Sequence, residues 1–546
     1  MPPARTMTVG QAFTEAMKAY QEGKLAAARR LALRLAETHP EFGGAHYLLG
    51  LVAIDEGQAR RAVGHLARAV AITPDQPALH FAMAQALEQA GEANEAILHY
   101  RHALARDPGH AQAHSRLGAL LLRLGKTEEG IAHCRHAVAI APRHAEAQMT
   151  LGAALLDSGK PAEALGHLHQ ALELRPDWPA ALNNFGVCLH KLGRSEQAVT
   201  VLSAVVDMNP DRGGVRANLA AALRAAGRLG EARAEAERAS RTAPRCAEAW
   251  LELGLVRQAE GHAEGAAAAF ERAVAAAPSL AHAYWCAAEA YRALGRKEKA
   301  TLYYTACLER DPEDRHGARL GLALVGAAET PDKAPESYVR QLFDDYADTF
   351  DDALVNTLDY RGPALIADAL ARGFAPLRGG KLSGLDVLDA GCGTGLAAAV
   401  LRPLARRLEG ADLSPAMVAK AAGRGVYDDL AVGELVETLS ARPERYDLVA
   451  AADVLVYFGD LDPVMGAAWL ALKPGGAFVF TTEALEARDG TFRLGAKSRY
   501  AHSPGYVRTA AQRAGFTMPL IENAATRREA GAEVPGLVAL AVKPAL

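Results

Sequence analysis

The sequence predicts a multidomain chain with two architectures in series, an all-α superhelical solenoid followed by an α/β Rossmann-like domain. Three observations lead to this fold class. The chain has 546 residues, more than a single hydrophobic core normally serves. Proline and glycine each recur at a fixed step of 34 residues through the first part of the chain. Beyond Leu382, a short apolar run leads into a glycine-rich turn and then into a helical pattern.

The 34-residue period indicates a repeated pair of helices. Glycine in the middle of each unit suits a turn that needs positive φ, and proline at the end of the unit stops the second helix. Within the unit 43–76, Leu48, Ala62 and Leu66 belong to a set of small and apolar residues spaced as on two packed helices. The residues that carry the period are Pro40, Pro74, Pro108, Pro142, Pro176, Pro210, Pro244, Pro278 and Pro312, with Gly23, Gly57, Gly91, Gly125, Gly159, Gly193, Gly227, Gly261 and Gly295.

This unit resembles the tetratricopeptide repeat (TPR). One copy of the TPR pattern consists of Gly50, Leu51, Gly57, Ala62, Val63, Ala69 and Pro74. We expect nine repeats over 9–314 and a capping helix with a linker over 315–336, the helix from Arg315 to Ala328, because the last repeat must cover its apolar face. The resemblance implies a concave groove that recruits a protein or peptide partner.

Three asparagines are candidates for that groove. Asn184 and Asn218 occupy the sixth position of their repeats, and Asn183 precedes the first of them. In this position the array resembles the repeats of O-GlcNAc transferase, which implies that the amides bind an extended peptide backbone. Only two repeats carry asparagine there, so two interpretations stand, a peptide clamp or polar residues that are satisfied inside the array.

Composition and charge narrow the class of partner. A formal net charge of -4 and a pI near 6.5 make nucleic acid an unlikely partner, because binding to phosphates needs a basic surface. The six cysteines contain no CxxC pair, and we expect reduced thiols. No secretory leader and no apolar span of 18 residues is present, which favours a cytoplasmic protein without a membrane partner. The oligomeric state is not indicated.

The domain expected over 337–546 begins with an amphipathic helix. Ser337 is expected to cap it, and apolar residues from Tyr338 to Phe350 are spaced by three and four. The acids of this segment are Asp344, Asp345, Asp348, Asp351 and Asp352. We expect them on a solvated face, and we predict no metal site because no metal-ligand spacing repeats among them.

A strand expected at 385–390 ends in the turn Gly391–Gly395, which opens a helix. Glycines in such a turn let the backbone approach a ligand and direct its amides toward polar groups. Asp412 ends the next strand, 408–412, 23 residues after Asp389, where a carboxylate accepts both hydroxyls of a ribose. This spacing suits NAD as well as other nucleotide ligands, so the turn alone leaves the cofactor open.

Three segments, 387–395, 410–417 and 472–476, resemble class I S-adenosyl-L-methionine (SAM)-dependent methyltransferases in order and spacing. The resemblance covers nearly all of the second domain and implies a methyltransferase enzyme with SAM as cofactor. The implied cofactor-binding residues are Asp389, Gly391, Cys392, Gly393, Gly395, Asp412, Leu413, Met417, Glu434, Leu435 and Asp453.

The same resemblance implies a role for each group of residues. The glycine turn approaches the methionine moiety, Asp412 holds the ribose, and Glu434 lies near the adenine amino group. Asp453 ends the strand expected at 447–453 and Tyr457 comes shortly after it, at the substrate side. His502 is a third catalytic candidate, as a general base near neutral pH, with a structural histidine before a helix cap as the alternative.

The segments 346–352 and 358–363 resemble the lead-in of bacterial methyltransferases with N-terminal TPRs, a subgroup whose lead-in folds over the cofactor. The alternatives are a buried core for the aromatic side chains and an ion pair for Arg361. Arg493 and Arg499 are candidates for holding an anionic substrate group. The lid and substrate candidates are Tyr338, Tyr346, Phe350, Tyr360, Arg361, Arg493, Arg499 and Tyr500.

The function predicted from the sequence is SAM-dependent methylation, with the TPR groove recruiting a protein or peptide substrate or partner. Two alternatives stand beside it. One is a small-molecule methyltransferase whose repeats only assemble a complex, and the other is a noncatalytic SAM-binding adaptor. No Asn-Pro-Pro-Tyr or Asp-Pro-Pro-Tyr element follows the fourth expected strand, which argues against an amino-methylating nucleic-acid enzyme of that type.

Overall fold

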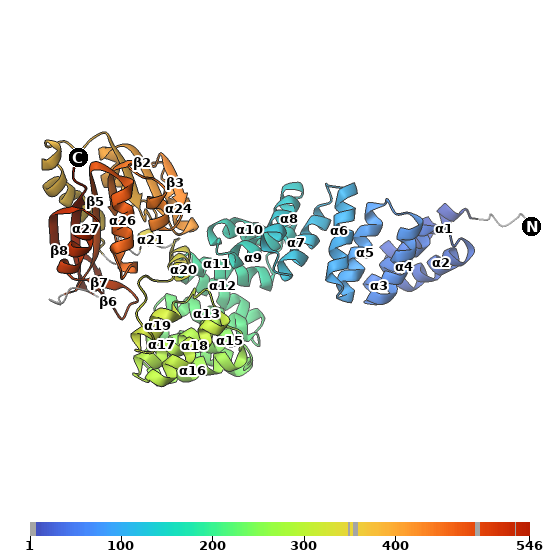
Figure 1. Ribbon diagram of the computed structural model, residues 1–546. Helices are drawn as coiled ribbons and strands as arrows, with labels where there is room; N and C mark the ends of the chain where they lie inside the picture. The colour runs from blue at the N-terminus through green and yellow to red at the C-terminus, as the bar shows by residue number, and fades with distance from the viewer. Residues whose placement is uncertain (1–6, 348–349, 353–358, 486–491, 530, 546) are drawn as a thin grey trace, which may run out of the picture. The chain divides into compact units, whose positions relative to one another are not determined.

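The computed structural model describes residues 7–347, 350–352, 359–485, 492–529 and 531–545. These residues form two compact units, Met1–Lys191 and Leu192–Leu546 (Figure 1). The division falls inside the repeat array, because the last repeats and the segment expected to be a linker near 330 belong to one compact unit with the α/β domain. Asp348 and Leu358 of the expected lead-in lie outside the described residues.

The first unit consists of helices that pack in consecutive pairs. Its helices are α1 (Val9–Gln21), α2 (Leu25–Thr38), α3 (Gly43–Asp55), α4 (Ala59–Ile72), α5 (Pro77–Ala90), α6 (Ala93–Arg106), α7 (Ala111–Arg123), α8 (Thr127–Ile140), α9 (Ala145–Asp157), α10 (Pro161–Leu174) and α11 (Pro179–Lys191). The glycines between paired helices have φ near +70°, for example 72° at Gly23 and 69° at Gly57. The positive φ expected at these positions is confirmed.

Small residues let the paired helices approach closely. A Cβ on Gly50 would lie 2.4 Å from Cγ of Leu66, and a Cβ on Gly152 would lie 2.7 Å from Cγ of Leu168. Leu66 itself is fully buried. Because such contacts recur at the same place in several repeats, a larger residue at these glycines would force the helices apart.

A polar contact also recurs in the first unit, and the sequence analysis missed it. Nε2 of His80 donates to the carbonyl of Pro74 at 2.7 Å, and Nδ1 of His80 lies 2.9 Å from Nδ1 of His99. One repeat later, His114 makes the same two contacts, with Pro108 and His133. In both repeats the first helix is tied to the preceding turn and to its partner helix.

The second unit begins with the remaining repeats. Its helices before the α/β domain are α12 (Ser195–Met208), α13 (Gly213–Ala225), α14 (Leu229–Thr242), α15 (Ala247–Ala259), α16 (Ala263–Ala276), α17 (Ala281–Ala293), α18 (Lys297–Arg310) and α19 (Ala318–Leu324). The capping helix α19 is shorter than the expected 315–328. Asp314 and Gly317 have positive φ, and the Asp314 carboxylate accepts from the Ala318 amide at 2.5 Å, so the helix starts only after this turn.

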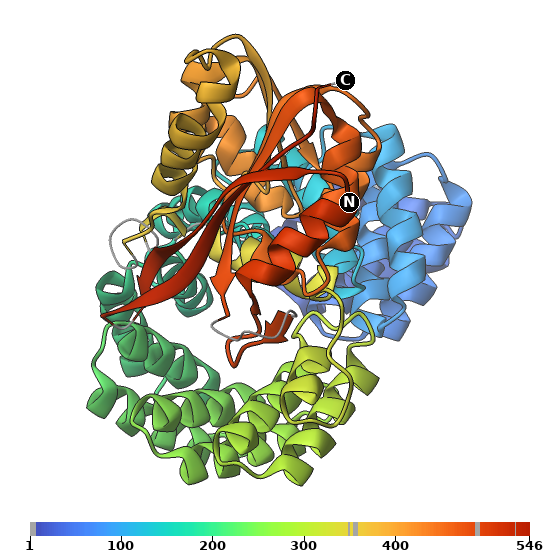
Figure 2. The ribbon, with the colours of Figure 1, turned by 60° about the vertical axis from the view of Figure 1, so that its left-hand side comes forward.

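The α/β domain is built on a nine-stranded sheet (Figure 2). The strands are β1 (Leu385–Ala390), β2 (Ala405–Asp412), β3 (Asp429–Val432), β4 (Tyr446–Ala451), β5 (Leu472–Ala484), β6 (Phe492–Leu494), β7 (Tyr500–His502), β8 (Thr517–Glu529) and β9 (Ala532–Val542). The order is β3-β2-β1-β4-β5-β7-β6, with β9 antiparallel to β5 and β8 antiparallel to β9. Strands β1 to β5 run parallel to one another, so their carboxyl ends share one edge.

Helices cover both faces of this sheet. They are α20 (Glu336–Tyr346), α21 (Phe350–Asp352), α22 (Gly362–Ala369), α23 (Ala398–Leu401), α24 (Pro415–Gly423), α25 (Leu435–Ser440), α26 (Asp462–Ala471) and α27 (Pro504–Arg513). Buried residues of α25, α26 and α27 form one core with β4 and β5, and buried residues of α22 and α23 form a second core with β1 and β9. None of the helices in the described part of the chain is both long and apolar enough to cross a lipid bilayer.

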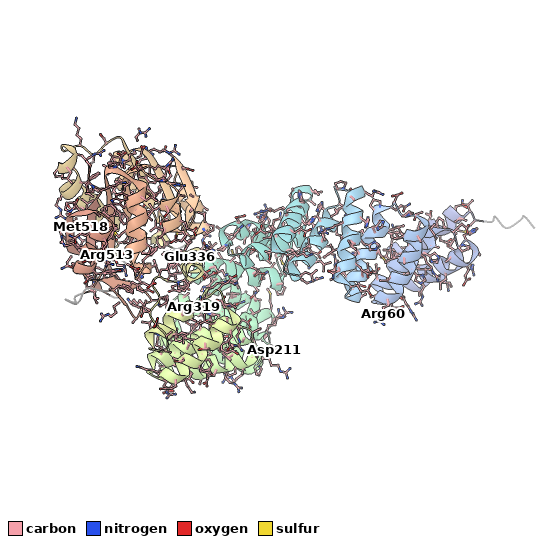
Figure 3. All side chains as sticks on the ribbon, viewed as in Figure 1. Arg60, Asp211, Arg319, Glu336, Arg513 and Met518 are labelled. Atoms are coloured by element: carbon pink, nitrogen blue, oxygen red, sulfur yellow. The ribbon has the colours of Figure 1, made fainter. Side chains whose placement is uncertain are left out.

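The segment between α19 and α20, which carry Arg319 and Glu336 (Figure 3), is non-helical, as expected. It is also bonded to the α/β domain, because Gly459 and Asp460 both donate their amides to the carbonyl of Asp332, at 2.7 and 2.8 Å. Ser337 is not the expected cap. Its hydroxyl lies inside the first turn of α20 and donates to the carbonyl of Glu313.

Candidate functional site

A cavity opens at the carboxyl ends of β1 to β4. Strand order reverses between β1 and β4, which is where ligands of parallel α/β sheets bind. Its lining from the first strands is Gly391, Cys392, Gly393, Thr394, Leu396, Ala397, Ala411, Asp412, Leu413, Gly433, Glu434 and Leu435. Its remaining lining is Lys333, Ala334, Glu336, Val339, Phe343, Phe350, Tyr360, Pro363, Ala452, Asp453, Val454, Tyr457, Phe458, Arg499 and Arg527.

The glycine turn is held by β2. The amides of Gly391 and Cys392 donate to the carbonyl of Ala411, and the amide of Gly393 donates to Oδ2 of Asp412 at 2.8 Å. Oδ1 of Asp412 accepts from the Ser414 amide at 2.9 Å. Burial raises the pKa of Asp412, and these amide donors oppose that rise. Asp412 therefore joins the turn to the start of α24.

Positive φ at both positions, and a lack of room for a Cβ at Gly391, explain why glycine occupies the turn. Gly391 has φ of 77°, and a Cβ there would lie 2.3 Å from Cγ2 of Val454. Gly393 has φ of 53°, and among the described residues a Cβ there would come within 4 Å of Phe350 alone, at 3.7 Å. The backbone at Gly393 thus faces open space between the turn and α21.

Asp389 lies below the turn and is almost fully buried. Burial raises its pKa to about 7, although the Tyr427 hydroxyl donates to Oδ2 at 2.6 Å and lowers it. Tyr427 follows α24 and was not among the residues singled out from the sequence. Asp389 is a buried support beneath the turn, because it does not line the cavity itself.

Two acids of the lead-in segment hold that segment against the start of α24 and the glycine turn. Asp344 accepts from the hydroxyl of Ser414 at 2.5 Å, and Asp351 accepts from the hydroxyl of Thr394. Arg424 donates to Asp351 at 2.6 Å. The expectation that these acids form a solvated face is therefore wrong for Asp344, whose carboxylate bonds to the buried Ser414, whereas the side chain of Asp351 stays 47% exposed beside Arg424. Helical spacing shows which residues share a face, but it cannot show that another loop covers that face.

The segment before α20 forms another wall. The Ala334 amide donates to the Tyr457 carbonyl at 2.8 Å, which pairs this segment with the loop after β4. Lys333 bonds to Glu336 at 2.7 Å and lies 3.7 Å from Glu434. Glu434 caps α25 by accepting from the Glu437 amide at 2.9 Å. Glu434, which was expected near an adenine, thus caps α25 and has Lys333 as a cationic neighbour.

A charged cluster occupies the far end of the cavity. Asp453 follows β4 with φ of 61°, and its Oδ2 accepts from Arg527 at 3.0 Å. Arg527 is 1% exposed and also donates to Glu483 at 2.5 Å and to Glu529 at 2.8 Å. Arg499 lies 3.4 Å from Glu529. The sequence analysis singled out Asp453 and Arg499 but missed Arg527, which comes from a distant strand.

A local irregularity explains how Arg527 reaches the cavity. The pairing of β8 with β9 shifts between Ala525 and Arg527, so Thr526 is an extra residue in β8. Such a bulge reverses which face the following side chains occupy. The charged run Arg527 to Glu529 carries no signal in the sequence that distinguishes it from an exposed strand end.

The structure does not support His502 as a general base near neutral pH. The ring is fully buried between Thr482 and Gly459, with Nε2 3.2 Å from the Gly459 carbonyl and Nδ1 2.8 Å from the Thr482 hydroxyl. Burial lowers its pKa to about 4. His502 is not among the described residues that line the cavity, and its contacts fit the structural alternative.

The other predicted site residues divide into two groups. Gly391, Cys392, Gly393, Asp412, Leu413, Glu434, Leu435, Asp453, Tyr457, Phe350, Tyr360 and Arg499 line the cavity. The described lining does not include Asp389, Gly395, Met417, Tyr338, Tyr346, Arg361, Arg493 and Tyr500. Met417 is buried in α24, the ring of Tyr338 packs on Gly317, and the Tyr500 hydroxyl donates to the Pro331 carbonyl at 2.7 Å. The cysteine of the turn, Cys392, is buried, which raises its thiol pKa.

The asparagines of the array lie on α11 and α13, the first helices of their repeats. The amide of Asn183 donates to the side-chain oxygen of Asn184 at 3.5 Å, and the amide of Asn184 lies 3.9 Å from the sulfur of Met149. Asn218 lies on α13. A peptide clamp at these three residues stays a prediction. Throughout the described residues, no group of three or more His, Cys, Asp or Glu side chains is placed to hold a metal ion.

Comparison with protein families assigns both regions. A methyltransferase-domain family matches residues 388–480. Three tetratricopeptide-repeat families match residues 10–208, 196–253 and 251–315. The chain therefore combines a tetratricopeptide-repeat array with an α/β methyltransferase domain, and the predicted fold class is confirmed.

Individual relatives match the second region. A ubiquinone biosynthesis O-methyltransferase of Methylobacterium sp. is 35% identical over 125 residues, which cover 22% of this chain and 50% of that protein. A probable S-adenosylmethionine-dependent methyltransferase of Mycolicibacterium smegmatis is 33% identical over 102 residues, 19% of this chain and 39% of that protein. The chain thus spans about half the length, or less, of these curated relatives.

Solved structures resemble the repeats. The crystal structure of YrrB, a TPR protein with an unusual peptide-binding site, is 21% identical with a TM-score of 0.31, covering 34% of this chain and 95% of that one. A thermophilic TPR protein of Thermus thermophilus is 27% identical with a TM-score of 0.31, covering 34% of this chain and all of that one.

Proposed function

We propose that the chain is a SAM-dependent methyltransferase whose cofactor binds at the carboxyl ends of β1 to β4. The main support for this proposal is that the matched segment and the cavity share the same residues. The segment 388–480, which matches the methyltransferase family, supplies the glycine turn, Asp412, Glu434 and Asp453 to one cavity. SAM supplies a methyl group that its sulfonium already activates, so the protein mainly aligns donor and acceptor.

The residues present fit this cofactor. Asp412 uses its two oxygens for the amides of Gly393 and Ser414, and a carboxylate has further acceptor sites for ribose hydroxyls. The open space beside Gly393 suits the close approach of a ligand to backbone amides. Leu413 and Leu435 supply apolar walls for a flat base, with Glu434 beside them as an acceptor for an amino group.

The lead-in helices would complete the enclosure. Phe343 and Phe350 line the cavity with ring centroids 5.9 Å apart, and Asp344 and Asp351 hold their segment against the start of α24 and the glycine turn. An apolar cover of this kind excludes water from the transferred methyl group.

Titration calorimetry with SAM and the full chain tests the cofactor. We expect Asp412→Ala to weaken binding by roughly 100-fold or more, because both the ribose acceptor and the anchor of the turn are lost. Asp412→Asn keeps one acceptor oxygen and should lose less. Asp429→Asn is the matched control, since Asp429 opens the adjacent strand β3, is half exposed and does not line the described cavity. Unchanged affinity in both Asp412 variants would refute the assignment.

We further propose that the TPR array recruits a protein or peptide substrate. This rests on the repeat-family matches over 10–315, since stacked helical repeats present extended binding surfaces. Labelled SAM in a native extract should then label macromolecules, and a chain lacking 9–191, cut at the boundary between the two compact units, should bind SAM but lose that labelling. Equal macromolecular labelling by both chains would contradict recruitment by the first unit.

The competing function is methylation of a small molecule. The similarity to the Methylobacterium relative favours it, because that protein is a ubiquinone biosynthesis O-methyltransferase. In the same extract experiment, label in the low-mass fraction with either chain would support this alternative. SAM binding without any transferred label would instead support a noncatalytic adaptor.

A further inference from the structure

Asp453 has two features that cost stability and that the protein fold does not compensate. Its backbone has φ of 61°, in the left-handed region, which aspartate adopts more readily than most residues but at a cost relative to glycine. Its Oδ1 atom is buried and has no hydrogen-bond partner among the described residues. Strained backbone and unsatisfied polar atoms of this kind concentrate at functional sites. Asp453 lines the cavity, so a bound molecule is the natural partner for its carboxylate.

The rest of the carboxylate is fixed in place. Oδ2 accepts from the buried Arg527 at 3.0 Å, and the Asp453 amide donates to the Thr481 hydroxyl at 2.9 Å. Arg527 is held in turn by Glu483 and Glu529. With Oδ2 held by Arg527, Oδ1 is the oxygen left to accept from a bound molecule.

The charges around the cavity favour a hydrogen-bond donor over an anion. Each cation in the described lining already contacts carboxylates, Lys333 with Glu336, Arg527 with Asp453, and Arg499 with Glu529. An anionic acceptor would therefore have to displace an existing partner while approaching Asp453. A hydrogen-bond donor instead satisfies Oδ1, and this argues against Arg499 as a binding site for an anionic group.

Aromatic rings surround the same end of the cavity. Phe343 and Tyr457 meet edge to face with ring centroids 5.6 Å apart, and Tyr360 also lines the cavity. Ring faces stabilise cations, and they do so most strongly where water is excluded. Together with Asp453, they suit a group that is cationic before or after methylation.

We propose that Asp453 binds the methyl acceptor and that the acceptor is an amine nitrogen. This inference rests on the proposed function. The acceptor enters as an ammonium ion, loses one proton to water and keeps an N–H bonded to the Asp453 carboxylate. Its lone pair then forms the N–C bond while the C–S bond of the sulfonium breaks with its electron pair on sulfur. The positive charge moves from sulfur to nitrogen, where Asp453 and the rings stabilise it until release.

Three small probes of similar shape test the binding preference, namely benzylamine, benzyl alcohol and benzoate. Ligand-observed NMR with the full chain, saturated with S-adenosylhomocysteine, should show benzylamine binding at least 10-fold more tightly than benzoate, with benzyl alcohol between them. Asp453→Asn should remove most of that preference, because asparagine tolerates positive φ and keeps the shape but loses the charge. Glu444→Gln is the control, since Glu444 also has positive φ but is 63% exposed.

Two results would overturn the inference. Benzoate binding as tightly as benzylamine would show that the cavity does not select a donor. A loss of SAM affinity of 10-fold or more in Asp453→Asn, with the benzylamine preference unchanged, would assign the carboxylate to the cofactor. Failure of the proposed function is a separate result, because the wild-type chain would then not bind SAM.

The chemistry of the product gives a second readout. Label transferred from SAM in native extract should survive mild base and be retained by cation exchange, as expected for N-methyl groups. Release of the label as methanol in base would indicate carboxyl methyl esters and contradict the inference. Stable label in neutral, base-resistant ethers would contradict it equally and would point to a hydroxyl acceptor.

Discussion

The repeat array and the methyltransferase domain use the same residue types in opposite ways. In the array, Gly159 has φ of 72° and a Cβ there would meet nothing within 4 Å, whereas at Gly391 a Cβ would lie 2.3 Å from Val454. Arg135 pairs with Glu163 while both are about half exposed, whereas Arg527 is 1% exposed among three carboxylates. The array repeats local contacts, and the site collects residues from distant parts of the chain.

This difference predicts which substitutions strongly reduce stability or ligand binding. A contact that recurs every 34 residues is one of many, and equivalent contacts in the neighbouring repeats contribute similarly to stability. A contact such as Arg527 with Asp453 occurs once and has no substitute. We therefore expect matched substitutions in the two regions to differ in their effects on stability and binding.

The largest effect is expected for the two arginines. Arg527→Met leaves three carboxylates near one another without their buried cation, which should cost about 3–5 kcal/mol in the free energy of unfolding. Arg135→Met removes an exposed pair and should cost about 1 kcal/mol or less. Urea unfolding of both variants measures the difference. Equal shifts in the midpoint would mean that the cluster around Arg527 is not a buried network.

The glycines come next. Gly391→Ala combines left-handed strain with a clash and should cost about 2–4 kcal/mol, together with loss of SAM binding. Gly159→Ala meets open space, so only the strain remains, about 1–2 kcal/mol. Urea unfolding and calorimetry with SAM measure both properties. If Gly159→Ala were as destabilising as Gly391→Ala, the contact with Val454 would not explain the glycine in the turn.

The smallest effect concerns pH, and it has opposite signs in the two regions. Burial raises the pKa of Asp389 from 3.8 to about 7, so its contribution to stability is present below pH 4 and is lost as the pH rises to about 7. Burial, with His80 and His102 nearby, lowers the pKa of His99 from 6.5 to about 4. Its contribution is present above pH 6.5 and is lost as the pH falls to about 4.

Two variants separate these contributions. Asp389→Asn should stabilise the protein more at pH 8 than at pH 5, because the penalty for a buried carboxylate disappears. His99→Gln should stabilise the first unit, relative to wild type, more at pH 5 than at pH 7. At pH 5 the wild-type histidine is protonated in the unfolded chain, and the variant lacks that protonation. Thermal unfolding at pH 5, 6, 7 and 8 gives both differences, expected at a few degrees. A pH-independent difference between variant and wild type would contradict the corresponding burial argument.

Much of the fold followed from sequence because its signals are local. The positive-φ glycines of the array and the strand at 385–390 were placed correctly, since a turn or a short apolar run depends on adjacent residues. The helix expected from Arg315 to Ala328 was too long. The turn at Asp314 and Gly317 depends on a carboxylate that bonds back to the helix start, and spacing alone does not reveal it.

The sequence by itself determined the period-34 array, the α/β class of the second domain and the glycine turn with Asp412 on the next strand. Only the tertiary contacts bring Asp344 to the start of α24 and Asp351 to the glycine turn, bury His502 away from the cavity, and join Arg527 to Asp453. The reason is sequence separation. Asp453 and Arg527 are 74 residues apart and meet only because β9 pairs with β5 and brings the bulged strand β8 alongside the site.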